Sequence, residues 1–206
     1  MREVVVVVAH PDPGSLTRAL AQAAVNAAGS LGVHARLQDL YADGFDPRMP
    51  AAEVGTTEFA DELTARYAAE VLAADVLVFV HPVWFFHLPA MLKGWVDRVL
   101  RDGVAYEVVQ GGATRGLLRA RAALVVNTAN SGPAAEAYLG DPLERFWRDV
   151  VLGPAGVSEV QRVRCAPVHG SEGGQRDAWL EEVGAAVSAM LQAPAGTLTG
   201  GNAPGP

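Results

Sequence analysis

Three segments of this sequence contain the residues that could do chemistry. Residues 10–17, HPDPGSLT, combine a histidine with a serine and a threonine. Residues 81–87, HPVWFFH, contain three consecutive aromatic residues, and residues 127–131, NTANS, contain amides and hydroxyls. Hydroxyls and backbone N–H groups bind anions, and aromatic rings stack on flat ligands. Together the three segments suit a ligand with an anionic tail and a heterocyclic ring.

The first segment is predicted to end a strand and begin a helix. Five valines precede it, and an apolar repeat of helical period begins near Ser15. A helix N-terminus offers free N–H groups and a positive dipole end, which bind phosphate without lysine, and the hydroxyls of Ser15 and Thr17 add donors. The segment is neither G-x-G-x-x-G nor a Walker loop. Ser15 is either a helix cap or a phosphate ligand, and His10 either a structural residue or a ligand.

The second segment places Trp84, Phe85 and Phe86 just beyond a buried strand. Generic surface loops avoid exposing so much apolar area. A wall of rings with backbone N–H groups between them suits a flat polar heterocycle, because the rings stack while the N–H groups bind its edge. Core packing or a subunit interface is the alternative for each ring. Trp95 lies on a helical stripe and is predicted to be core.

The elements that position these segments alternate between strands and helices. Apolar runs at residues 4–9, 76–80 and 122–126, with weaker runs at 33–37 and 159–163, predict strands buried on both faces. Segments of helical period follow each of them, including one over residues 143–150 before the last strand, and their apolar stripes include Leu31, Leu72 and Val150. This pattern predicts an α/β fold, a flavodoxin-like doubly wound five-stranded parallel sheet in the order 2-1-3-4-5 with helices on both faces. Ligands of such sheets bind at the carboxyl ends of the strands, where the three segments meet.

The composition bounds the class of protein. The 206 residues are 50% hydrophobic and 19% charged, which fits one globular domain, predicted over residues 1–193. Residues 194–206 are rich in Gly and Pro and are predicted to be a disordered tail. The net charge of −7 argues against nucleic-acid binding. We expect no membrane span, no signal peptide and no metal site. The single cysteine fits a reducing compartment, so we expect a cytoplasmic protein.

The sequence also resembles a known family. Residues 81–100, HPVWFFHLPAMLKGWVDRVL, and GVAY at 103–106 resemble the signature of the NAD(P)H:quinone oxidoreductase (DT-diaphorase-like) branch of the flavodoxin-like flavoproteins. VVVVVAHPDPGSLTRAL near the start and LYADGFDP at 40–47 are similar to the same family. The resemblance implies bound FAD or FMN and two-electron transfer from NADH or NADPH to a quinone or another small aromatic acceptor by a ping-pong cycle. It also implies a homodimer.

The resemblance assigns cofactor-binding roles by position. The residues that match the family's phosphate-binding positions are His10, Ser15, Leu16 and Thr17. Those that match the positions lining the isoalloxazine ring are Pro82, Val83, Trp84, Phe85 and Phe86. In the family, backbone N–H groups of this second segment contact flavin N5 and O4. The order of the aromatic residues is altered, because Trp84 stands where relatives often carry glutamine and Phe85 where they carry tryptophan.

The third segment departs from the family. Many relatives have Thr-Thr-Gly-Gly, whereas this chain has Asn127, Thr128, Ala129 and Asn130. Asn and Thr can still bind the O2 and N3 edge of a flavin, and Asn tolerates the left-handed backbone that Gly adopts. Asn127, Thr128 and Asn130 are therefore candidates to stabilise reduced flavin. Relatives of the diaphorase type use a tyrosine and a histidine. Leu139 occupies the histidine position, and Tyr138 is the nearest substitute.

The sequence favours a flavin-dependent NAD(P)H oxidoreductase. The missing tyrosine–histidine pair leaves an alternative of another class, a flavin-binding regulatory or electron-carrier subunit of the potassium-efflux ancillary type without significant turnover. A chain that keeps the fold but has lost its flavin is a third possibility.

Overall fold

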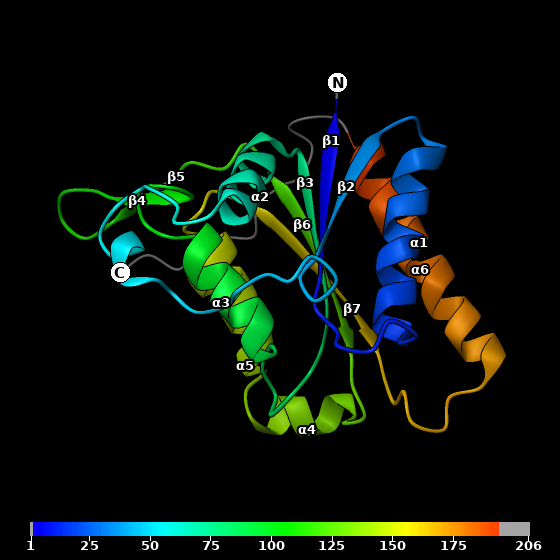
Figure 1. The fold of residues 1–206 in the computed structure, drawn as a ribbon. Helices are drawn as coiled ribbons and strands as arrows, with labels where there is room; N and C mark the ends of the chain where they lie inside the picture. The colour runs from blue at the N-terminus through cyan, green and yellow to red at the C-terminus, as the bar shows by residue number, and fades with distance from the viewer. Residues whose placement is uncertain (1, 194–206) are drawn as a thin grey trace.

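Five parallel strands form one sheet at the centre of the molecule (Figure 1). The computed structural model describes residues 2–193, so the tail predicted at residues 194–206 lies outside the described residues. The strands are β1 (Glu3–Val8), β2 (His34–Asp39), β3 (Val76–Pro82), β6 (Ala122–Thr128) and β7 (Glu159–Cys165). Their order across the sheet, β2-β1-β3-β6-β7, confirms the predicted 2-1-3-4-5 order.

The three central strands end at the same edge of the sheet. β3 and β6 are buried along their whole length, and β1 is buried from its second residue, because helices cover both faces. The register places Val8 beside Val80 and Val80 beside Val126. β3 and β6 each continue for two more residues, to Pro82 and Thr128. The three segments singled out in the sequence therefore begin side by side.

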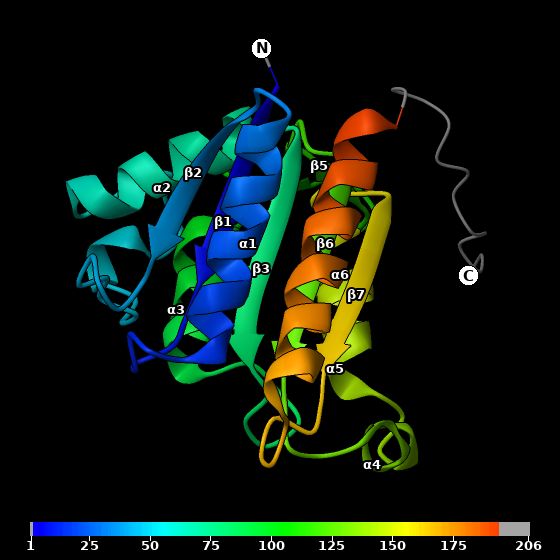
Figure 2. The same ribbon diagram turned by 90° about the vertical axis from the view of Figure 1, so that its right-hand side faces the viewer.

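Helices cover both faces of the sheet (Figures 1 and 2). On one face lie α1 (Leu16–Ser30) and α6 (Gly173–Gln192). On the other lie α2 (Glu62–Ala73), α3 (Ala90–Val99) and α5 (Pro142–Arg145), which continues as a π-helix over Phe146–Leu152. A short helix, α4 (Pro133–Tyr138), lies at the edge where the strands end. The indole of Trp95 is fully buried between α3 and the sheet, as predicted.

The predicted helical stripes need three corrections. The helix predicted before the last strand is present, but Phe146–Leu152 has π-helical hydrogen bonds. This changes the spacing of its side chains, so Val151 is buried and Val150, predicted in the stripe, is 63% exposed. Leu31 and Leu72 were placed on buried faces by their spacing, yet they lie at helix ends and are 39% and 37% exposed.

An antiparallel hairpin of β4 (Tyr106–Val108) and β5 (Thr114–Gly116) forms a separate two-stranded sheet, and its Gly116 lies against the backbone of Ala155 and Gly156 (Figure 1). No pattern in the sequence predicts this hairpin. Each strand has three residues and none of them is buried, so neither is long enough or apolar enough to stand out as a strand in the sequence.

The long connection between β2 and α2 packs against α3. The guanidinium of Arg98 is 1% exposed and donates to Glu53 at 2.5 Å and to Asp61 at 2.6 Å. A Cβ atom on Gly94 would lie 2.2 Å from the carbonyl oxygen of Pro47, so this approach of the two backbones requires glycine. An ion-pair network and one glycine thus hold the connection on the α3 face.

Candidate functional site

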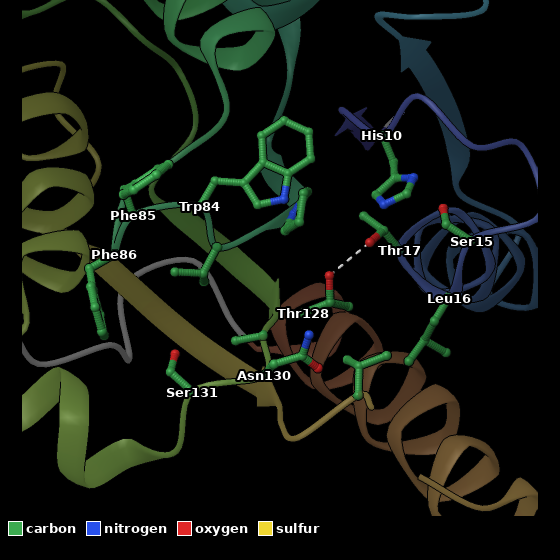
Figure 3. A pocket seen from close by; sticks show the side chains of 14 residues that line it. His10, Ser15, Leu16, Thr17, Trp84, Phe85, Phe86, Thr128, Asn130 and Ser131 are labelled. Carbon is green, nitrogen blue, oxygen red and sulfur yellow. Dashed lines mark hydrogen bonds between the residues drawn. The ribbon is translucent and has the colours of Figure 1, made fainter. Parts of the chain in front are cut away.

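A cavity of about 450 Å³ lies at the carboxyl ends of β1, β3 and β6 (Figure 3). Its size is within the range of small-molecule binding sites. All the residues predicted to bind cofactor line it, with the exception of Asn127. Ser131 and Val168 line it as well. Val168 follows the outer strand β7, which no motif marked, so the sequence offered no signal for it.

The N-terminus of α1 forms one end of the cavity. Ser15 is the N-cap, and its hydroxyl accepts a hydrogen bond from the backbone N–H of Arg18 at 3.3 Å. The N–H groups of Leu16 and Thr17 have no acceptor among residues 2–193, and both residues line the cavity. The cap and the free donors are therefore different groups. This end of the cavity can bind an anion through backbone N–H groups and the helix dipole.

The hydroxyls of Thr17 and Thr128 lie 2.8 Å apart, and both side chains are buried (Figure 3). This bond joins α1 to the end of β6. Either hydroxyl can be the donor, so Thr17 keeps its hydrogen for an anion only when Thr128 donates to it, and its role as a phosphate ligand stays a prediction. His10 also has a partner, since its Nδ1 accepts the backbone N–H of Asp12 at 3.1 Å. His10 is therefore hydrogen-bonded within its own turn, as a structural residue would be, and it also lines the cavity, as a ligand would.

The second side of the cavity is the aromatic turn, residues 84–87. Trp84 and His87 exchange backbone N–H···O bonds of 3.0 Å in both directions, and Phe85 and Phe86 between them have φ angles of 51° and 57°. These are features of a type I′ turn, which normally takes Asn or Gly at both central positions. Aromatic residues adopt positive φ at a cost, and such strain is concentrated at functional sites.

The aromatic residues do not form one continuous wall. Trp84 extends toward the middle of the cavity, whereas Phe85 and Phe86 lie along its rim (Figure 3). Trp84 is 43% exposed and Phe85 is fully exposed. The backbone N–H of Val83 donates to Thr128 at 2.8 Å, but those of Phe85 and Phe86 have no acceptor in the described part of the chain. The strained turn thus leaves two backbone donors free beside one indole ring.

The third side is formed by Thr128, Ala129, Asn130 and Ser131. The backbone of Ala129 is bonded to Cys165 and Val168, at 3.1 Å and 2.9 Å. The side-chain oxygen of Asn130 accepts the N–H of His169 at 2.8 Å, which leaves its amide nitrogen as a donor. Asn130 does not have positive φ, contrary to the expectation that it replaces a left-handed glycine. In the described chain, the left-handed non-glycine residues of this site are those of the aromatic turn.

Two predicted catalytic residues do not lie on the cavity. Asn127 is 1% exposed and points to the opposite face of the sheet from Thr128, because successive strand residues alternate. Its amide oxygen accepts from Arg162 at 2.5 Å, and its amide nitrogen lies 3.0 Å from His81 Nε2. Tyr138 is the last residue of α4 and is 89% exposed outside the cavity lining.

Charge within the site comes from backbone groups. Its lining residues include no lysine, arginine, aspartate or glutamate. Beneath it, burial lowers the pKa of His81 to about 4, and burial also lowers the pKa of His87. Residues 2–193 hold no cluster of His, Cys, Asp or Glu able to bind a metal ion. Nor does that part of the chain contain a helix long and apolar enough to cross a membrane.

Comparisons with known proteins agree with this geometry. A family model described as flavodoxin-like fold matches residues 2–191. The human ribosyldihydronicotinamide dehydrogenase (quinone) is 31% identical over 156 residues, which cover 66% of this chain and 66% of that protein. The FMN-dependent NADH:quinone oxidoreductase of Azotobacter vinelandii is 42% identical over 98 residues, 46% of each chain. The chain spans about two thirds of the length of the first of these relatives and about half of the second.

Solved structures show the same fold. Smu.1420 from Streptococcus mutans superimposes with a TM-score of 0.80 at 24% identity, covering 91% of this chain and 99% of that one. An NAD(P)H:quinone oxidoreductase from Methanothermobacter marburgensis gives 0.77 at 24% identity, covering 91% and 98%.

Proposed function

This chain belongs to the flavodoxin-like fold family, and on that premise we propose that it is an FMN-dependent NAD(P)H oxidoreductase that reduces quinones by two electrons. One observation carries the proposal. A single cavity has free N–H groups of a helix N-terminus at one end and free N–H groups beside an indole ring at the other. Relatives named as FMN-dependent quinone oxidoreductases support FMN as the flavin and a quinone as the acceptor.

The residues fit the parts of FMN. The N–H groups of Leu16 and Thr17 would hold the phosphate, which suits a cavity without basic side chains. Trp84 would stack on the isoalloxazine ring, and the N–H groups of Phe85 and Phe86 would bind one edge of it. When bound, the flavin supplies the redox chemistry, taking hydride from NAD(P)H and passing it to the acceptor in the same cavity in a ping-pong cycle.

The protein contributes preorganised donors to this chemistry. Backbone N–H groups fixed by a turn do not have to reorient when negative charge develops on the ring, so they stabilise it efficiently. Thr128 and Asn130, which belong to the third side of the cavity, are the remaining candidates to bind the pyrimidine edge. They would take over the charge stabilisation that the tyrosine and histidine provide in diaphorase-type relatives.

A regulatory or electron-carrier subunit is the second candidate, and one observation favours it. Leu139 occupies the relay histidine's position and Tyr138 lies outside the cavity lining, so no side chain of that pair serves the site. Such a protein would bind FMN without sustained turnover.

Steady-state turnover separates the two. Purified protein loaded with FMN is mixed with NADH or NADPH, with and without menadione, and absorbance at 340 nm is followed. If the chain is an enzyme, we expect NAD(P)H to be consumed only when quinone is present. Double-reciprocal plots should give parallel lines when both substrates are varied. Bound FMN without consumption supports the regulatory subunit, and a chain that takes up no flavin refutes both.

We also propose that the chain forms a homodimer in the cytoplasm and that residues 1–193 are one domain. The fully exposed Phe85 at the rim of the cavity supports an interface near the site. Sedimentation equilibrium tests the dimer, and a monomer at micromolar concentration would contradict it.

A further inference from the structure

A fully buried histidine lies directly behind the cavity wall. His81 has no exposed surface and is the second-last residue of β3, immediately before Pro82 of the cavity lining. Its Nδ1 lies 2.9 Å from the carbonyl oxygen of Pro82. Its Nε2 lies 3.1 Å from the indole nitrogen of Trp147 and 3.0 Å from the amide nitrogen of Asn127. Every nitrogen of the ring is therefore bonded.

The partners fix which nitrogen carries the proton. The indole of Trp147 only donates. The amide of Asn127 has one orientation, because its oxygen accepts from the guanidinium of Arg162, which also only donates. Both groups therefore donate to Nε2 of His81, which must be unprotonated. The proton is on Nδ1, from which it can be donated only to the carbonyl of Pro82.

The network continues to the elements beside the cavity. Arg162 of β7 is 5% exposed and donates to Glu136 of α4 at 3.1 Å and to Asp141, the N-cap of α5, at 2.7 Å. A continuous set of buried hydrogen bonds therefore joins the start of the aromatic segment, through His81 and Asn127, to α4 and α5. Leaving a buried polar group of such a network without its partner is costly in folding free energy. Each side chain of the network therefore restricts the position of the next.

The carbonyl of Pro82 is the group that this network controls. β3 and β6 stop pairing at the cavity, where the N–H of Val83 donates to Thr128, and in residues 2–193 no backbone N–H donates to Pro82. That oxygen accepts from the buried imidazole, so at least one of its two lone pairs is directed into the protein. The adjoining aromatic turn has two free backbone groups that we assign to the flavin ring. Both are N–H donors, those of Phe85 and Phe86.

We propose that His81 is a positioning residue of the site, whose Nδ1–H holds the Pro82 carbonyl inside the protein and so keeps an acceptor away from the flavin ring. The inference rests on the proposed function. A carbonyl oxygen near the ring would repel the negative charge of the reduced flavin, whereas the N–H donors attract it. His81 thereby favours binding of the reduced form over the oxidised form.

The tautomer is tested first, without flavin. Long-range ¹H–¹⁵N spectra resolve the ring nitrogens of the five histidines, and the signals missing from His81→Gln assign His81. We expect the Nδ1–H form, unchanged down to pH 5. An Nε2–H tautomer or a charged ring would overturn the inference whether or not the protein binds FMN.

The second test compares oxidised and dithionite-reduced FMN in titrations of wild type, His81→Phe, His81→Gln and Trp147→Phe. We expect His81→Phe to weaken binding of reduced FMN about tenfold more than that of oxidised FMN, equivalent to a potential lower by about 30 mV. His81→Gln, which keeps a donor and an acceptor, restores most of this difference. Trp147→Phe loses stability but leaves the ratio unchanged, because the bond to Pro82 remains.

The outcomes separate the two claims. Equal loss for both redox forms in His81→Phe, with normal binding by wild type, refutes the positioning role and leaves the proposed function intact. Failure of wild type to bind either form refutes the proposed function and the inference with it. If His81→Phe does not fold, His81→Leu takes its place, and a ratio of reduced to oxidised binding equal to that of wild type overturns the inference.

Discussion

Leu16 is the first residue of α1, and its backbone N–H is one of the two free donors at the proposed phosphate end. Proline is tolerated at this helix position because no intrahelical bond uses that N–H. The preceding Ser15, with φ −69° and ψ 150°, already has the conformation that proline requires. Leu16→Pro therefore removes one donor while the helix persists.

We expect Leu16→Pro to bind FMN about tenfold or more weakly than Leu16→Ala, since a hydrogen bond to a charged group contributes roughly 1.5–3 kcal/mol. Leu16→Ala loses the same side chain but keeps the N–H. Riboflavin, which has no phosphate, should distinguish the two variants little. Isothermal titration measures all four affinities, and equal FMN affinities would show that the phosphate lies elsewhere.

His81 also links protonation to stability. Burial lowers its pKa from 6.5 to about 4 in the folded protein. The unfolded chain therefore binds more protons between these values, and the stability that depends on neutral His81, complete above pH 6.5, is lost as pH falls toward 4. We expect wild type to lose about 3 kcal/mol more than His81→Gln between pH 7 and pH 4. Urea unfolding at both pH values measures it. Parallel losses would mean that His81 titrates normally. His87, whose pKa is also lowered, is present in both proteins.

At the scale of elements, the aromatic turn shows strain that the sequence could not reveal, because aromatic residues prefer negative φ. Phe85 is fully exposed, so burial of its ring does not offset the conformational energy of its positive φ. We expect Phe85→Asn to raise the free energy of unfolding by about 0.5–1 kcal/mol, since Asn tolerates this conformation, and to lower turnover with quinone. Leu139→Asn, at a half-exposed site with φ −89°, should give no gain. Thermal unfolding of both variants checks this, and a less stable Phe85→Asn would contradict it.

The contact between α3 and the β2–α2 connection depends on Gly94. A methyl group there would lie 2.2 Å from the backbone of Pro47, so Gly94→Ala should destabilise the protein by about 2 kcal/mol or more. Gly184→Ala in α6 is the control, because its Cβ would lie 3.8 Å from Ala27, an ordinary contact. Helix propensity then raises stability by about 0.5–1 kcal/mol. Denaturant unfolding should therefore show a lower free energy of unfolding for Gly94→Ala and a higher one for Gly184→Ala. An unchanged free energy in Gly94→Ala would show that the connection can move.

At the scale of the whole molecule, the sheet could be read from sequence because its strands are uniform apolar runs buried on both faces. The hairpin of β4 and β5 could not, since it is short and not buried, and the π-helical turn could not, since it keeps an apolar repeat while changing its period. The segments that form the cavity follow from strand order. Which side of the sheet each side chain takes does not, and this is why Asn127 was expected on the cavity while the structure places it in the network behind it.

The network itself carried no sequence signal. A histidine at a strand end is common, and His81 becomes informative only when Trp147 and Asn127, distant in the chain, meet its Nε2. The donors available to a ligand are backbone N–H groups. Because every residue except proline has one, the residue types cannot show which of them are free.

We propose that one cavity, between the start of α1 and the aromatic turn, binds one FMN. Titration of flavin-free protein with FMN, followed by quenching of the flavin's own fluorescence, tests it most directly. We predict one FMN per chain, with strong quenching by the stacked Trp84 and binding about tenfold weaker in Trp84→Leu. No saturable uptake of FMN or FAD by wild type, or the same affinity and quenching in Trp84→Leu, would contradict it.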